Sequence, residues 1–400
     1  MRFSGKLGVL LGLLVIALIA VAGCGGGGSS SSSSSTASSE SSAGAEEEGS
    51  ASNAADEESA GGAADLATAE EGIKPYVGKA SPGFPVDEPL KEAPSPSMKI
   101  SQLQFGTPQG AIIAEFWKQA ADTAGVQIMT TKGGSTASSI QSAAQTMISQ
   151  SPDAVLLPAA EPDTFAPQLE EMVDQGIDIY SSGIMDPQKY HFTGSVFDER
   201  QTKLIGELLA DWVLVKRGPQ AKVAFYGTPE LAFSGVEEEA FEAQLGKICP
   251  ECEVRGVAIK AEEIGSTAPN TVVSDLQAHP DTEQAVFASQ EADDGLPAAL
   301  KAAGIEVGIV GFAADPATLE YIKNGEVEAT LDVDGPVQIW TPMDMALRTA
   351  QGLPLTKGEK AGIMPMQFLT QKDITFDPSK GWTAYPDFVE RFSKLWKVGP

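Results

Sequence analysis

Three cysteines and two histidines are the residues of this 400-residue chain whose types most readily suggest chemistry. Cys24 ends an uncharged apolar stretch that starts at Leu7, and Arg2 and Lys6 precede that stretch. The stretch is short for a helix that must cross roughly 30 Å of hydrocarbon, and small residues come directly before the cysteine. This pattern predicts a secretory signal over residues 1–23.

The segment Val21-Ala22-Gly23-Cys24 resembles a bacterial lipobox, in which a peptidase cuts before the cysteine and its sulfur carries a lipid. The resemblance implies that Cys24 anchors the mature chain to the outer face of the bacterial cell membrane. The alternative is an uncleaved membrane helix that ends in a cysteine by chance. In both cases we expect the chain after residue 24 to lie outside the cytoplasm.

Cys249 and Cys252 are separated by two residues, and outside the cytoplasm we expect this pair to form a structural disulfide. A thioredoxin-like redox pair would stand at the start of a helix, whereas this pair follows a helical pattern. A zinc site would need two more ligands, and the only histidines are His191 and His279. Free thiols, metal binding and redox chemistry remain as alternatives.

No group of residues has the spacing of a catalytic site. Residues 132–136 read Lys-Gly-Gly-Ser-Thr, but the lysine precedes the glycines and the full phosphate-loop spacing is missing. Two histidines offer little capacity for general acid-base catalysis. We therefore expect no enzyme, no metal and no cofactor, with a hydrolase built from scattered Asp, Glu and Ser residues as the alternative.

The chain is strongly acidic, with 27 Lys and Arg residues against 55 Asp and Glu residues. Removal of residues 1–23 would leave 25 basic and 55 acidic residues. Such a surface repels phosphate groups, which excludes nucleic acid as a partner and disfavours anionic lipid headgroups.

Two segments after the signal differ in composition from the rest of the chain. Residues 24–73 are mostly Gly, Ser, Ala, Thr and acidic residues, which predicts a disordered tether that spans very roughly 35 to 40 Å. Residues 74–97 are rich in proline and predict an extended lead-in on the surface of the folded part.

From residue 98 onward, short apolar strands alternate with amphipathic helices, a pattern typical of parallel sheets. The first set of strands is predicted at 99–105, 126–130, 154–157, 177–180 and 192–196, and a long helix follows at 198–215. The second set is predicted at 222–226, 253–258, 285–288, 307–312 and 329–333, before a helix at 336–351 and a strand at 363–369. The sequence therefore predicts an α/β protein with two doubly wound lobes joined by a hinge.

Ligands of open parallel sheets bind beyond the carboxyl ends of the strands. Two lobes of this kind that face each other would form a cleft, and closure about the hinge would bury a small solute.

Several phrases of the sequence together resemble the ribose/galactose-type periplasmic binding proteins, whose type I fold is shared with the lactose-repressor class. They are Ala278-His279-Pro280-Asp281 before Gln284–Ala288, then Val310-Gly311-Phe312, and then Gly325–Leu331. The resemblance covers residues 98–369. It implies that lobe 1 comprises residues 98–196 and 335–369, that lobe 2 comprises residues 197–334, and that residues 370–400 are a C-terminal extension.

The same resemblance implies a solute receptor that delivers a small polar molecule, a sugar or sugar-like compound, to the permease of an ABC importer. The export signal, in the place of a DNA-binding helical pair, favours this receptor over a regulator. We expect a monomer. The alternatives are a sensor that signals through a membrane receptor, and an importer receptor for a neutral or cationic solute that is not a sugar.

The resemblance also implies which positions line the pocket. The loop after the first strand supplies Phe105, Thr107 and Gln109, and the end of the fourth strand supplies Ser181 and Ser182 where the family has an Asp-Arg pair. In the second lobe the implied positions are Phe233, Glu237 in place of an arginine, Gln290 in place of an asparagine, Asp315 near the family's aspartate, and Asp332 and Asp334 at the end of the hinge strand.

These positions depart from a sugar pocket, because two of its key charged groups are missing and no arginine balances the carboxylates. This favours a neutral polar or cationic solute. Structural roles compete at several positions: a helix terminus for Glu237, a helix cap for Asp334, and core packing for Phe105 and Phe233. The amide of Gln290 has the least evident structural role, since it follows a strand in a loop.

Overall fold

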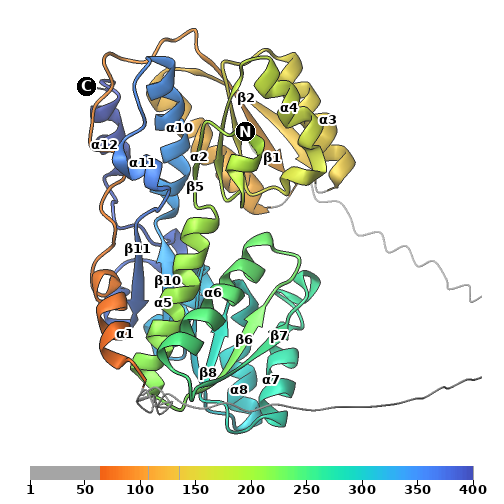
Figure 1. Ribbon diagram of the computed structural model, residues 1–400, viewed down its shortest axis with the longest axis vertical. Helices are drawn as coiled ribbons and strands as arrows, with labels where there is room; N and C mark the ends of the chain where they lie inside the picture. The colour runs from red at the N-terminus through yellow and green to blue at the C-terminus, as the bar shows by residue number, and fades with distance from the viewer. Residues whose placement is uncertain (1–63, 107, 135, 400) are drawn as a thin grey trace, which may run out of the picture. The chain divides into compact units, whose positions relative to one another are not determined.

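The computed structural model describes residues 64–106, 108–134 and 136–399 (Figure 1). The predicted signal, Cys24, most of the predicted tether and Thr107 lie outside the described residues. Within the part that is described, no helix is both long and apolar enough to cross a membrane.

Sheet 1 is a five-stranded parallel sheet with the order β2-β1-β3-β4-β5. Its strands are β1 (Lys99–Phe105), β2 (Gln127–Gly134), β3 (Ala154–Leu157), β4 (Asp178–Ser182) and β5 (Gly194–Val196). Alternate side chains of each strand enter different cores, because successive residues of a strand point to opposite faces. Val155 and Leu157 pack with α3 (Ala137–Ser149) and α4 (Ala166–Asp174), which follows η2 (Pro162–Phe165). Ala154 and Leu156 pack on the other face, with α2 (Pro108–Ala124) and α10 (Gly335–Ala350).

Sheet 2 is a four-stranded parallel sheet with the order β7-β6-β8-β9. Its strands are β6 (Lys222–Gly227), β7 (Glu253–Ala258), β8 (Gln284–Phe287) and β9 (Gly308–Gly311). Val223 and Phe225 share a core with α5 (Glu199–Arg217) and α6 (Ala232–Ile248). Ala224 and Tyr226 face the second core, with α7 (Ala268–Ala278), α8 (Leu296–Ala303) and α9 (Pro316–Asn324). Both sheets therefore carry helices on both faces, which confirms the predicted fold class.

A third, two-stranded antiparallel sheet, here called the connecting sheet, consists of β10 (Ala329–Val333) and β11 (Met366–Thr370). The predicted strand at 363–369 corresponds to β11, which pairs with β10 and not with sheet 1. A bridge between Phe312 and Leu331 attaches the connecting sheet to the edge of sheet 2. The chain passes between the two large sheets after β5, after β10 and before β11, where α11 (Lys357–Ala361) leads into the strand.

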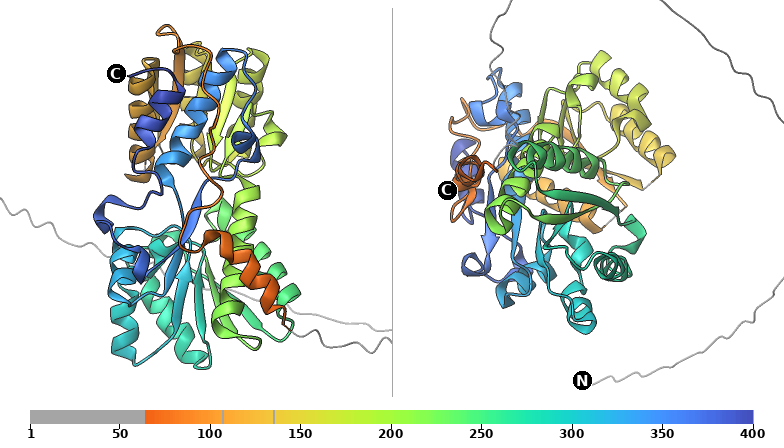
Figure 2. Two further views of the ribbon diagram at one scale, coloured as in Figure 1. Left: turned by 90° about the vertical axis from the view of Figure 1, so that its left-hand side faces the viewer. Right: turned by 60° about the horizontal axis from the view of Figure 1, so that its bottom comes forward.

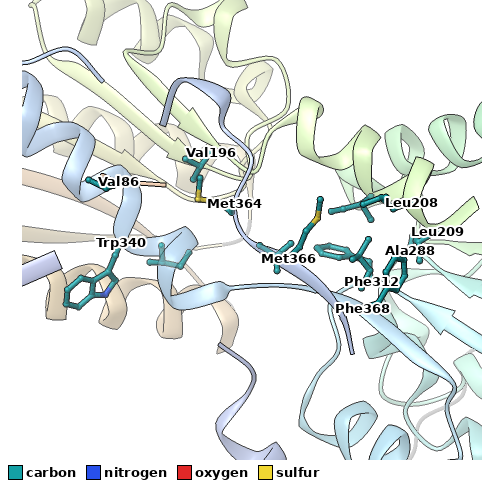
Figure 3. Close-up of a cluster of buried hydrophobic side chains, with 14 of the residues drawn as sticks. Val86, Val196, Leu208, Leu209, Ala288, Phe312, Trp340, Met364, Met366 and Phe368 are labelled. Carbon is teal, nitrogen blue, oxygen red and sulfur yellow. The ribbon is translucent and has the colours of Figure 1, made fainter. Parts of the chain in front are cut away.

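One hydrophobic cluster continues across the connecting sheet (Figure 3). Met366, Phe368 and Phe312 pack with Leu208 of α5, while Val196 and Trp340 belong to the same cluster on the side of sheet 1. The apolar contact between the two halves of the molecule is therefore concentrated where the chain crosses.

The segments before β1 and after β11 are folded onto this framework. Helix α1 (Leu66–Ile73) includes the last eight residues of the segment predicted to be a disordered tether. The prediction is wrong for these residues because Ala69 and Ile73 are buried in a core that the local composition does not indicate, and Asp65 caps the helix. After β11 the chain forms η6 (Gln371–Asp373), η7 (Pro378–Lys380) and α12 (Phe388–Leu395).

Candidate ligand-binding site

The carboxyl ends of sheets 1 and 2 meet at an aromatic contact. Phe197 directly follows β5 of sheet 1, Phe312 directly follows β9 of sheet 2, and their ring centroids are 5.6 Å apart. Phe233, in the first turn of α6, packs edge-on against Phe312 at 6.1 Å. Phe197 and Phe233 are partly buried and Phe312 is buried. These three residues, here called the aromatic trio, lie where open parallel sheets place their ligands.

The backbone adopts the left-handed conformation at Phe197 and at the residue after Phe312. Phe197 has φ of 51°, and Ala313, next to Phe312, has φ of 58°. Residues other than glycine seldom adopt this left-handed conformation, and they do so mainly where the surrounding structure enforces it. The sequence interpretation included Phe233 but missed Phe197. Its signal would have been an aromatic residue immediately after the last strand of the first set.

The loop after β1 contributes less than predicted within the described residues. Phe105 is partly buried and packs against the core between sheet 1, α3 and α4, while Gln109 is exposed in the first turn of α2. Thr107 lies between them, outside the described residues.

Both serines at the end of β4 are buried and hydrogen bonded. The Ser181 hydroxyl donates to Ser195 Oγ at 2.9 Å, across to β5. The Ser182 hydroxyl accepts from Gln338 Nε2 of α10 at 3.0 Å. The hydrogen bond of Ser181 thus stays within sheet 1, whereas Ser182 and Gln338 form a pair of polar side chains near the carboxyl end of β4.

Glu237 is fully buried in α6, on the same helix face as Ser234 and Phe241. Neither of its carboxyl oxygens has a hydrogen-bond partner among the described residues. Burial, and then the neighbouring Glu238 carboxyl, holds the pKa of Glu237 well above its ordinary value. The side chain of a helical residue leans toward the N-terminus of the helix, so this carboxyl leans toward the turn that carries Phe233.

Gln290 begins the short helix η5 (Gln290–Asp293) after β8 and is fully buried. Its amide nitrogen donates to Asp293 Oδ2 at 3.2 Å and to the Ala329 carbonyl at 3.4 Å. The Thr318 hydroxyl donates to the other carboxyl oxygen of Asp293 at 2.8 Å. Burial raises the pKa of Asp293 to about 7, although these two hydrogen bonds oppose the shift.

This network ties η5 to β10 and to α9, where Asp315 accepts from the Thr318 amide at 2.8 Å as the helix cap. The Oε1 atom of Gln290 has no partner among the described residues. The sequence interpretation included Gln290 and Asp315 but missed Asp293 and Thr318. Asp293 comes three residues after Gln290, and Thr318 comes three residues after Asp315. This spacing was the signal in the sequence that could have identified them.

Asp332 and Asp334 occupy different environments at the end of β10. Leu331 and Val333 point into the core that contains the aromatic trio, so Asp332, between them, lies on the opposite face of the strand. Burial, together with the nearby Asp334 charge, raises the pKa of Asp332 to about 8. Asp332 is therefore not on the same side of the connecting sheet as Phe312.

Asp334 is buried and has three partners. Its carboxylate accepts from the Val337 amide at 3.1 Å as the N-cap of α10, from the Thr383 hydroxyl at 2.9 Å and from the Ala384 amide at 2.8 Å. Burial raises the pKa of this carboxyl. Asp334 therefore links the end of β10 to the C-terminal segment by hydrogen bonds.

The remaining chemical candidates do not assemble into a reactive centre. Cys249 and Cys252 form a disulfide with Cα atoms 5.4 Å apart, in the turn between α6 and β7. Over the described residues, no group of three or more His, Cys, Asp or Glu side chains has a geometry that could hold a metal ion.

Solved structures of low sequence identity share this fold. An ABC transporter periplasmic solute-binding protein from Actinobacillus succinogenes, with bound D-allose, matches 70% of this chain and 99% of its own at 16% identity, with a TM-score of 0.57. A solute-binding protein from Burkholderia graminis in complex with D-arabinose matches 74% of this chain and 100% of its own at 17% identity, with a TM-score of 0.59. The myo-inositol-binding protein of Caulobacter matches 70% of this chain and 95% of its own at 20% identity, with a TM-score of 0.59.

Comparison with proteins of curated function gives no sequence match. The family model of the periplasmic binding protein domain matches residues 102–354, which include both large sheets except the first three residues of β1. The chain therefore belongs to the periplasmic binding protein family, and its task is to bind a molecule and not to catalyse a reaction.

Proposed function

We propose that this protein is the solute receptor of an ABC-type importer and that it binds a small polar solute, a sugar or sugar-like compound, between its two lobes. The observation that carries the proposal is the meeting of the two sheets' carboxyl ends at Phe197 and Phe312. A solute at this point would contact both halves of the molecule at once, and closure of the halves around it would signal occupancy to a permease.

The chemistry of the site is compatible with a polyol. Phe197 and Phe233 are partly buried, so each offers part of a ring, and aromatic faces pack well against the apolar C–H faces of sugars. The Ser182 hydroxyl, the Gln338 amide and the unpartnered Gln290 Oε1 are the nearby groups that would bind hydroxyls. The similar structures named above hold D-allose, D-arabinose and myo-inositol, which are all polyhydroxylated.

We propose that the halves close by rotation about the three passages of the chain beside the connecting sheet. Phe197, Asp334 and Pro365 lie in these passages, and the Asp334 amide donates to the Pro365 carbonyl at 2.8 Å. Hinges of this type absorb φ/ψ changes at a few residues while the packed sheets stay rigid.

We also propose that Cys24 carries the lipid that anchors the receptor to the outer face of the cell membrane, and that the permease is its partner. Radiolabelled palmitate should enter the wild-type chain in the host and should be absent from a Cys24→Ser variant. Equal labelling of both chains would refute the anchor but leave the binding proposal intact.

Calorimetric titration with D-allose, D-arabinose, D-ribose and myo-inositol tests the binding proposal. We expect at least one of these solutes to release or absorb heat with saturation, and we expect Phe197→Ala to weaken that binding. Phe192→Ala is the matched control, because Phe192 is a partly buried phenylalanine two residues before β5, packed against the core that does not contain the aromatic trio. If no solute gives heat, and small-angle scattering gives the same envelope with and without every solute, the receptor assignment fails.

One observation favours a second ligand class, a neutral or cationic solute other than a sugar. The loops that follow the nine parallel strands carry eleven carboxylates and two lysines, against a ratio of about two to one in the whole chain. The carboxylates are Glu161, Asp163, Asp186, Asp198, Glu230, Glu262, Glu263, Glu291, Asp293, Asp294 and Asp315, and the lysines are Lys189 and Lys260. One of the two lysines, Lys189, is already paired with Asp163 at 3.0 Å.

Such a concentration of negative charge attracts cations and repels anions. Putrescine and choline therefore belong in the same titration series. Binding of either, with no response to the polyols, would select this second class. A sensor that signals through a membrane receptor would bind in the same way and would be distinguished by its partner in a cross-linking experiment.

A further inference from the structure

The segments before β1 and after β11 are each attached to both halves of the molecule. We call residues 64–97 and residues 371–399 together the terminal clasp. Figure 2 shows the first of these segments, in orange, running from α1 beside α5 past the connecting strands toward sheet 1. These two segments therefore add two crossings between the halves of the molecule to the three passages already described.

The N-terminal half of the terminal clasp has three successive attachments. On the side of sheet 2, the Asp65 amide donates to the Ile248 carbonyl at 2.7 Å, and the buried Ala69 and Ile73 of α1 pack with α5 in the shared core. At the connecting sheet, Ser81 and Met366 exchange two backbone hydrogen bonds of 2.9 and 3.0 Å. This segment therefore adds a short strand contact to β11 before it continues.

On the side of sheet 1 the same segment is held by side chains. The Thr356 hydroxyl donates to the Pro85 carbonyl at 2.9 Å, and the Arg348 guanidinium donates to the Glu88 carbonyl. Arg348 is buried in α10 between Asp344 and Glu359, with nitrogen–oxygen distances of 3.1 and 3.4 Å. The lead-in is thus anchored to a buried ionic group and not to the surface alone.

The C-terminal half of the terminal clasp repeats this arrangement. Gln371 donates to the Lys323 carbonyl of α9 at 3.0 Å, on the side of sheet 2. The chain then passes the Asp334 carboxylate and ends in α12, where Trp396 stacks on Trp340 of α10 with ring centroids 5.5 Å apart. The Trp396 indole also donates to Asp344 at 2.7 Å, so both segments of the terminal clasp contact the buried ionic group of Arg348, Asp344 and Glu359.

The two segments of the terminal clasp also contact each other. Phe84 lies against Tyr385 and Phe392, with ring centroids 5.2 and 5.0 Å apart. The Leu90 amide donates to the Leu395 carbonyl at 2.9 Å. The two segments therefore form one unit and not two independent tails.

We propose that the terminal clasp limits how far the two lobes open and so keeps the solute-free protein near the arrangement that binds. The proposal deepens the receptor function proposed above and rests on its hinge closure. A receptor whose binding-competent state is a fraction of the population has its affinity reduced by that fraction. A restraint that removes wide-open states therefore strengthens binding without touching the solute.

The test makes the clasp slack while all its contacts are kept. Gly83 lies between the attachments to the connecting sheet and to sheet 1, is exposed, and has open space around it. Gly381 has the same open surroundings and lies between η7 and Asp334's partner Thr383. Six Gly and Ser residues inserted at either position would add about 13 Å of root-mean-square slack.

The matched control is the same insertion at Gly125, an exposed glycine with open space around it in the turn between α2 and β2, within one lobe. Single-molecule energy transfer between dyes on Ser142→Cys of α3 and Ala302→Cys of α8, in a Cys24→Ser background, reports the distance between the lobes. Both labelled positions are exposed. Thermal unfolding of each variant checks that both lobes remain folded, and the single insertions carry the test if the double insertion unfolds.

We expect the insertions at Gly83 and Gly381 to shift the solute-free distance distribution to longer and broader values, more so together, and the insertion at Gly125 to leave it unchanged. We expect the affinity for any of D-allose, D-arabinose or myo-inositol that binds to weaken at least about fivefold in the double insertion. A distribution identical to that of the wild type in the slack variants overturns the clasp. This readout needs no solute, so a failure of the receptor function, seen as no heat with any solute, is recognised separately.

Discussion

Replacement of Glu237 by glutamine should change the pH dependence of stability more than stability itself. The native carboxyl is fully buried without a hydrogen-bond partner among the described residues, and burial raises its pKa above the ordinary 4.5. In the unfolded chain the same group loses its proton near the ordinary value. Above that pH the unfolded state binds fewer protons than the native state, so the wild type loses stability as pH rises toward the native pKa.

The size of the effect follows from proton linkage. While the unfolded group is ionised and the native group is protonated, each pH unit costs the wild type about 1.4 kcal/mol. Glutamine carries no titrating proton and has nearly the same shape, so this slope disappears in the variant. In the pH range where the unfolded group is ionised and the native group is still protonated, we therefore expect the melting temperature of the wild type to fall by about 2 °C per pH unit relative to that of Glu237→Gln.

Scanning calorimetry of the two proteins from pH 4 to pH 8 measures this difference. Glu239→Gln is the control, because it removes an exposed carboxylate from the same helix. A constant difference between wild type and Glu237→Gln across the range would refute the reasoning, since it would show that the native group ionises as readily as the unfolded one.

Three further predictions concern packing and covalent structure. Gly206→Ala should destabilise the protein by about 1 to 3 kcal/mol in urea unfolding, because a Cβ at this position would clash with the backbone of α6 and lie 2.9 Å from the Phe241 amide nitrogen. Gly235→Ala is the control and should cost little, because Gly235 has open space around it. Trp396→Phe should cost about 1 to 3 kcal/mol in the same assay, because it removes the indole donor to a buried carboxylate, and an unchanged midpoint would contradict the buried hydrogen bond. Joint replacement of Cys249 and Cys252 by serine should lower stability by about 2 kcal/mol, since the disulfide closes a very short loop, and thiol titration of the denatured wild type should find this pair unreactive until a reductant is added.

Local patterns were sufficient to predict the framework of this protein. Short apolar strands and amphipathic helices alternate from residue 98, and β1 has the predicted bounds of Lys99–Phe105. Such patterns are readable because the period of apolar residues depends only on neighbours in the chain and on which face is buried. The long helix expected at 198–215 is likewise α5, which ends at Arg217 with Gly218 as its C-cap.

The candidate site was less accessible from sequence. The family resemblance places Gln290 in the pocket, and a loop amide has little evident structural role, but the structure gives its amide nitrogen two partners, Asp293 and the Ala329 carbonyl. Its role in ligand binding remains a prediction. Asp332 lies on the face of β10 opposite to Val333, a consequence of strand register that residue identity does not reveal.

By itself, the sequence determined two doubly wound lobes and the acidic character of the whole chain, because both follow from residue order and composition. Only the tertiary structure decided that α1 is ordered, that Phe197 meets Phe312, and that residues 64–97 and 371–399 each contact both lobes. Each of these depends on contacts between residues far apart in the chain. Helix α1 is short and gains its stability from the surface that it buries, which no local pattern specifies.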